Sequence, residues 1–95
     1  MRNRYVYLHL AVKPREKGQV FYVGIGTHNS DDKYHRMKSN KGRNSYWKST
    51  VKKYGIKRVV FSDNLTTEQA CGLEKDLIET FQGDVNYDIK YLRDI

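Results

Sequence analysis

Glu74 is the anomaly in the pattern of the last expected helix. It lies four residues after Ala70 and four before Ile78, so it falls inside the apolar stripe. A carboxylate that faces a core is costly unless it is paired or binds a cation. Two interpretations follow: a glutamate at the edge of the stripe that snorkels or meets an arginine, or a ligand for a hard ion such as Mg²⁺. Proteins typically hold that ion with one or two carboxylates plus water and phosphate.

Tyr7 and Tyr22 are expected to project from one face of a β-hairpin. Residues 5–12 alternate strictly in hydropathy, which predicts a half-buried strand, and residues 19–25 predict a second strand after a short charged turn. If the aliphatic side chains of both strands share one face, the two tyrosines share the other. Tyrosine has a reference pKa near 10 and is a poor base unless a positive field lowers that pKa. The pair is therefore either ordinary strand composition or part of a site.

The second strand has an expected register. One face carries Phe21, Val23 and Ile25, and the other carries Val20, Tyr22 and Gly24.

Other sequence motifs that carry known chemistry are incomplete in this chain. The run Gly24–Gly26 is a lone G-x-G, because Asn29 stands where a dinucleotide site needs its third glycine. His28 and His35 have no cysteine partners for zinc, and Cys71 lies in a helix pattern, where packing is the better interpretation. On their own, Arg36 could clamp a phosphate or pair with an acid, and Asn86 is a loop residue.

Helices and a third strand must position these residues, in the order β-β-α-α-β-α. A helix capped by Ser30–Asp32 is expected to run to about Lys41, although its apolar content is thin. A second helix starts at Asn44 or Ser45 and ends at Gly55.

The third strand and the last helix follow directly. Residues 56–62 predict the strand and residues 63–64 a turn. Thr66 and Gln69 then form a capping box, with Leu65 and Ala70 as a hydrophobic staple.

The charge of this 95-residue chain is concentrated in its middle. The net charge is +7, and residues 33–58 hold ten bases and no acid, whereas residues 63–95 hold eight acids and three bases. A dense positive block with interleaved aromatics suits a polyanion such as nucleic acid, and the alternative is a solvated face that binds nothing specific. The length fits one domain, 1–95, and the single cysteine and the absence of a membrane-length apolar run favour a cytoplasmic protein.

Taken together, these residues resemble the GIY-YIG nuclease family. Tyr5-Val6-Tyr7 stands at the first motif and Tyr22-Val23-Gly24 matches the second. Further matches of residue order and spacing are Arg36-Met37, Arg43 to Trp47, Lys53-Tyr54-Gly55 and Leu73 to Ile78. Tyr5 stands where the first motif has glycine. The resemblance implies an α+β fold, with a small three-stranded antiparallel sheet flanked by helices, and metal-dependent cleavage of DNA phosphodiesters.

The resemblance also implies roles. Tyr7 and Tyr22 are the motif tyrosines, Arg36 stabilises the transition state, and Glu74 holds Mg²⁺ or Mn²⁺. Some members have a histidine one turn after the arginine; Asn40 stands there, and His35 is the candidate substitute. Asn86 corresponds to a polar residue that follows the glutamate.

DNA is the expected partner, held through its backbone by the basic block. The expected contacts are Lys33, Lys38, Lys41, Arg43, Lys48, Lys52 and Lys53. Nicking, action on branched DNA, and targeting by a protein partner or a second copy remain open alternatives. The rival function is a non-catalytic nucleic-acid-binding module on the same fold.

Overall fold

The protein is a small α+β domain built on a three-stranded antiparallel sheet, as expected. The computed structural model describes residues 2–12, 20–43 and 45–82. Along the chain the elements are β1 (Arg4–Leu10), β2 (Val20–Thr27), α1 (His35–Lys38), α2 (Ser45–Tyr54), β3 (Lys57–Leu65) and α3 (Thr67–Gln82). The strands lie in the order β2-β1-β3, so the first strand is central. In the described residues, no helix has the length and apolar character that a membrane span requires.

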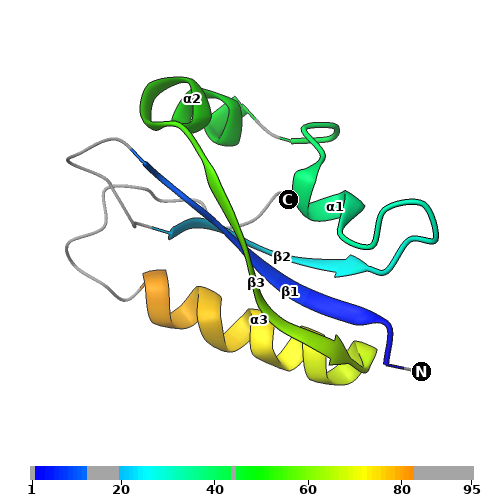
Figure 1. The fold of residues 1–95 in the computed structure, drawn as a ribbon. Helices are drawn as coiled ribbons and strands as arrows, with labels where there is room; N and C mark the ends of the chain where they lie inside the picture. The colour runs from blue at the N-terminus through cyan, green and yellow to red at the C-terminus, as the bar shows by residue number, and fades with distance from the viewer. Residues whose placement is uncertain (1, 13–19, 44, 83–95) are drawn as a thin grey trace.

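The two faces of the sheet are covered by different helices (Figure 1). Helix α3 runs along one face, and α1 and α2 lie over the other. The α3 face is aliphatic: Val6, Leu8 and Val23 pack there against Ala70 and Ile78. Because β1 is central and both of its faces are covered, its residues 5–9 are all buried.

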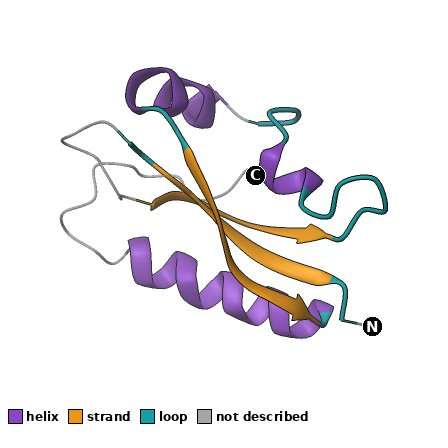
Figure 2. Ribbon diagram, viewed as in Figure 1, coloured by secondary structure: helices purple, strands orange, loops and turns teal. Residues whose placement is uncertain are grey.

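The opposite face is aromatic. Tyr5, Tyr7 and Tyr22 pack there with Met37 from α1 and Trp47 from α2. Figure 2 shows α1 and α2 above the sheet and α3 below it. Alternation along β1 therefore separates two cores, and the tyrosine face is an interior surface covered by α1 and α2.

The expected register of β2 is wrong at its first two residues. Pairing with β1 shifts between His9 and Leu10, so that Leu10 pairs with Val20 and skips Phe21. Phe21 consequently joins the aromatic core and Val20 joins the aliphatic one, the reverse of the expectation. An extra residue in one strand turns the following side chains to the other face of the sheet.

The two glycines of β2 are explained by the tyrosines of β1. Tyr7 pairs with Gly24 and Tyr5 pairs with Gly26. A Cβ atom added at either glycine would overlap the ring of its partner tyrosine. The G-x-G run is therefore space for two rings that lie across the neighbouring strand.

Helix α1 is shorter than expected. It spans only His35–Lys38, its N-cap is Tyr34 with no side-chain cap, and Ser39 is already extended. The expected helix from the Ser30–Asp32 cap to Lys41 is wrong. The segment offers few apolar side chains to a core, and a helix of that length gains its stability mainly from packing.

Strand β3 is longer than expected. It runs to Leu65 through the residues that were expected to turn, and Asn64 adopts φ 55° within it. Asparagine tolerates this left-handed conformation better than most residues, so a residue typical of turns is accommodated inside an irregular strand.

Helices α2 and α3 have the expected termini. Gly55, with φ 76°, follows the last residue of α2, and its N–H bonds to the carbonyl of Val51. Thr66 and Gln69 form the reciprocal capping box: the backbone N–H of each donates to the side chain of the other, at 2.9 and 3.2 Å. The N-terminal limit of α3 is thus set by its own sequence.

Candidate active site

Arg43 lies buried beneath α1 and α2, against the hydroxyl of Tyr7. Only 4% of its surface is exposed, and both terminal nitrogens lie 3.3 Å from the Tyr7 oxygen. The guanidinium also donates to the carbonyls of Ser39 and Arg36, at 3.1 and 2.8 Å. These bonds place a fixed positive group directly beside the Tyr7 hydroxyl.

Aromatic rings complete the surroundings of Arg43. Its guanidinium carbon lies 4.8 Å from the ring centroid of Tyr22 and 5.3 Å from that of Trp47. A cation over an aromatic face gains electrostatic energy, and more when the pair is desolvated. The rings of Tyr7 and Tyr22 lie 5.9 Å apart. Arg43 therefore contacts both tyrosines, and the three side chains form one cluster.

The hydrogen bonds to Tyr7 have a defined direction. A guanidinium has donors only, so the Tyr7 oxygen accepts from Arg43 and its own proton points elsewhere. This is the arrangement that a proton-transferring tyrosine requires.

His9 is a buried neutral member of the same cluster. The Trp47 indole N–H donates to its Nδ1 at 2.9 Å, which leaves the proton on Nε2 to be donated to the Met37 carbonyl at 2.8 Å. Burial lowers the pKa of His9 to about 3, against the hydrogen bond to Met37 and together with the positive charges of nearby arginines. His9 thus ties β1 to both α1 and α2 without carrying charge.

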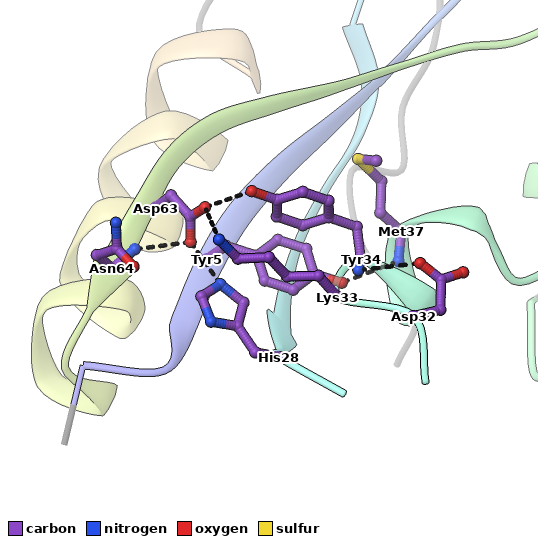
Figure 3. A network of polar contacts seen from close by, with 8 residues as sticks. All are labelled: Tyr5, His28, Asp32, Lys33, Tyr34, Met37, Asp63 and Asn64. Atoms are coloured by element: carbon purple, nitrogen blue, oxygen red, sulfur yellow. Dashed lines mark hydrogen bonds and ion pairs between the residues drawn. The ribbon is translucent and has the colours of Figure 1, made fainter. Parts of the chain in front are cut away.

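A second polar network fixes the segment between β2 and α1 (Figure 3). The Asp63 carboxylate accepts from the Tyr34 hydroxyl and, at 2.6 Å, from His28 Nε2, and Lys33 approaches it at 3.8 Å. Partial burial alone would raise the pKa of Asp63, but hydrogen bonds from Tyr34, the Asn64 backbone and His28 lower it to about 2. The carboxylate therefore anchors this segment to β3.

The same network continues to the tyrosine face. Tyr5 stacks on His28 with 5.7 Å between ring centroids, and its hydroxyl accepts the backbone N–H of Met37 at 3.3 Å. Tyr5 thereby links the Asp63 network to the start of the cover formed by α1.

The predicted antiparallel pairing of the two strands, with both tyrosines on one face, is confirmed. Tyr7 and Tyr22 come from antiparallel neighbouring strands and lie on one face. Arg36 lies above them on α1, but its guanidinium donates to the Lys41 carbonyl at 2.9 Å, whereas its backbone carbonyl receives Arg43. His35 is exposed on α1. Asn86 lies outside the described residues.

Glu74 lies on the other side of the sheet. Its stripe position is confirmed, since Ala70 and Ile78 are buried and Glu74 is half-buried between them, but α3 packs on the aliphatic face. Glu74 could meet Tyr7 and Tyr22 only if α3 bordered the tyrosine face, and α3 borders the opposite face.

The Glu74 carboxylate has the oxygen chemistry that Mg²⁺ prefers, but its side of the sheet does not fit a metal acting beside the tyrosines. Within residues 2–12, 20–43 and 45–82, no three histidine, cysteine or acidic side chains cluster as metal ligands would.

Six of the seven predicted nucleic-acid contacts are exposed lysines on the side of the sheet that α1 and α2 cover. They are Lys33, Lys38, Lys41, Lys48, Lys52 and Lys53. The seventh, Arg43, differs from these lysines, because its side chain is buried and donates to the Tyr7 hydroxyl. Helix α3 carries four acids and one lysine on the opposite side. The two layers therefore differ in charge.

Sequence reasoning missed His9 and Trp47 as members of the site, and it assigned Arg43 to DNA contact and not to the tyrosine cluster. The signal for His9 was present, because alternation places it on the same face as Tyr7. The signal for Trp47 was its place on the apolar stripe of α2. Nothing local marks Arg43, whose burial depends on the path of the turn after α1.

Comparison of the chain with models of protein families, with curated proteins and with solved structures finds no match.

Proposed function

We propose that this protein is an endonuclease that hydrolyses DNA phosphodiester bonds at the Tyr7–Tyr22–Arg43 cluster. The observation that carries the proposal is the pair of hydrogen bonds from a buried guanidinium to the Tyr7 hydroxyl, on a face that Tyr22 shares. A tyrosine held in this way can pass a proton to or from an attacking water or a leaving oxygen. The resemblance to the GIY-YIG family points to the same two tyrosines.

In this proposal the parts of the chain have separate tasks. The exposed lysines around α1 and α2 hold the DNA backbone without reading bases. Tyr7 exchanges a proton, Tyr22 orients water or phosphate, and Arg43 is a positioning residue that acts through Tyr7. The family resemblance also implies a divalent ion, Mg²⁺ or Mn²⁺, but Glu74, which would hold it, lies on the other side of the sheet, so no step at this cluster is assigned to the ion.

The second candidate is a nucleic-acid-binding module without catalysis. It is favoured by the complete burial of Tyr7 and by the position of Glu74 on the opposite layer. A binding module needs the lysines and uses the aromatic cluster only as a core. The two candidates therefore differ in what removal of the tyrosine hydroxyls does.

The deciding experiment measures cleavage of supercoiled plasmid and of branched DNA with Mg²⁺, with Mn²⁺ and with chelator. Wild type, Tyr7→Phe and Tyr22→Phe are compared, with Tyr54→Phe on α2 as a control that removes a hydroxyl outside the cluster. Loss of about 100-fold or more in rate for the first two, with DNA affinity retained, supports the endonuclease. Tight DNA binding by wild type without any cleavage identifies the binding module.

A further inference from the structure

Three guanidinium groups converge on the turn that joins α1 to α2. Each is held by a different residue of the segment 39–41. Arg43 donates to the Ser39 carbonyl at 3.1 Å, Arg58 to the Asn40 side-chain oxygen at 3.1 Å, and Arg36 to the Lys41 carbonyl at 2.9 Å. These arginines come from three separate parts of the chain, so their convergence is a property of the fold.

Arg58 differs from an ordinary surface arginine. It lies on β3 opposite His9, on the tyrosine side of the sheet, and is half-buried. Its Nε is inaccessible to solvent and has no hydrogen-bond acceptor among the described residues. A buried donor without an acceptor loses its hydration without compensation, which is a substantial penalty for a charged group. An acceptor that enters from outside and displaces the Asn40 side chain from this guanidinium would remove that penalty.

The electrostatics point to an anion. The positive charges of Arg36, Arg43 and Arg58 all act on His9 and each lowers its pKa, so the three groups lie within reach of one another's fields. Like charges gathered at a partly buried site repel one another more strongly than in water. The exposed Asn40 and Lys41 leave the turn open to solvent on its outer side. An anion arriving from that side would relieve the repulsion.

We propose that Arg58, together with the 39–41 turn, forms a binding site for a phosphate group. The forked guanidinium suits phosphate oxygens, because Nε and a terminal nitrogen can donate to two oxygens at once. We take the phosphate group to be a backbone phosphate of bound DNA, and only this choice of source rests on the proposed function. The site itself follows from the contacts of Arg58.

The test uses inorganic phosphate as the probe, in the complete chain. The melting temperature is measured in phosphate and in chloride at equal ionic strength, and phosphate affinity is measured by calorimetry. Arg58→Gln is compared with Lys57→Gln, which removes one charge from the neighbouring exposed position of the same strand. Phosphate should stabilise wild type and Lys57→Gln, and Arg58→Gln should bind it about tenfold more weakly.

A second variant covers the case in which Arg58→Gln does not fold. Asn40→Asp, at an exposed position, places a carboxylate where it pairs with Arg58 and competes with the anion. It should remain folded and lose phosphate binding. The proposed site is overturned if phosphate still binds to both Arg58→Gln and Asn40→Asp. It is also overturned if Lys57→Gln loses as much phosphate affinity as Arg58→Gln does.

DNA affinity distinguishes the two sources of phosphate. If Arg58→Gln weakens DNA binding more than Lys57→Gln does, the phosphate belongs to DNA. If Arg58→Gln loses phosphate binding but keeps DNA binding, the phosphate site is supported, and the proposal that its phosphate comes from DNA is overturned. Plasmid cleavage by wild type is scored separately, so failure of the proposed function leaves the phosphate result interpretable.

Discussion

The ring of Tyr7 lies across Gly24, its partner on the neighbouring strand, in the space that a side chain at position 24 would occupy. Tyr7 and Gly24 are therefore one packing unit. The hydroxyl of Tyr7 reaches Arg43 only because the ring can lie this close to the backbone of β2.

Gly24→Ala should destabilise the fold. The added methyl overlaps the Tyr7 ring, and overpacking of this kind costs about 1–3 kcal/mol of unfolding free energy. Gly72→Ala on α3 is the matched control, because a Cβ there meets nothing within 4 Å. That control should gain about 1 kcal/mol. Urea denaturation of both variants gives the comparison, and equal stability of Gly24→Ala and wild type would contradict the packing unit.

Acidification should unfold the protein through His9. Its pKa is about 3 in the folded chain and near 6.5 in the unfolded chain, so the unfolded state binds the extra proton between those values. Stability is then complete above about pH 6.5 and falls as the pH drops toward 3, by up to about 1.4 kcal/mol per unit. Denaturation midpoints measured from pH 7.5 to 4.5 test this.

His9→Gln is the variant that isolates this effect. It should be less stable than wild type at pH 7 and lose most of the slope. Retention of the full slope in His9→Gln would assign the effect to another group.

Asp63 should contribute to stability in a different pH range. Its pKa is lowered to about 2, so its contribution is present above the unfolded value near 3.8 and is lost as the pH falls through 2. Asp63→Asn should cost roughly 1–2 kcal/mol at pH 7, and this cost should shrink steadily as the pH falls from 4 through 2. Hydrogen exchange should quicken in residues 28–34, which the carboxylate holds.

Asp32→Asn provides the contrast for Asp63. Asp32 forms an exposed pair with Lys38 at 3.0 Å, and such pairs contribute little. Matching losses in the two variants would argue against Asp63 as the anchor.

DNA binding should weaken steeply with salt, because the expected contacts are to phosphates. Replacing Lys48, Lys52 or Lys53 singly should weaken binding modestly on every sequence and lower the salt slope by about 1. Lys75→Ala on the acidic helix α3 is the control and should bind as wild type does. Binding that is insensitive to salt, or lost on one sequence only, would indicate recognition of bases.

Local rules predicted the elements whose signals lie within a few residues. The Thr66–Gln69 box and the stripe of α3 required no knowledge of the rest of the chain. The shared face of Tyr7 and Tyr22 followed from alternation, because both residues lie on the regular side of the irregular pairing at Leu10.

Features that depend on distant contacts were not predictable. The shift that places Phe21 among the tyrosines depends on how β2 pairs with Leu10, and a single strand carries no mark of it. Helix α3 covers the face of the sheet opposite Tyr7, so Glu74 and Tyr7 lie on different sides. A stripe fixes which face of a helix is buried but not which face of a sheet receives it.

The single tryptophan of the chain stands inside the candidate site, so the protein carries its own optical reporter. The Trp47 indole donates to His9 and lies over the Arg43 guanidinium, and its fluorescence should change when either group moves. Emission from one buried ring should therefore follow the arrival of DNA or phosphate in unlabelled protein, on the millisecond timescale of stopped-flow mixing. Binding, rearrangement of the α1–α2 cover and any later chemical step could then be separated in time within one sample.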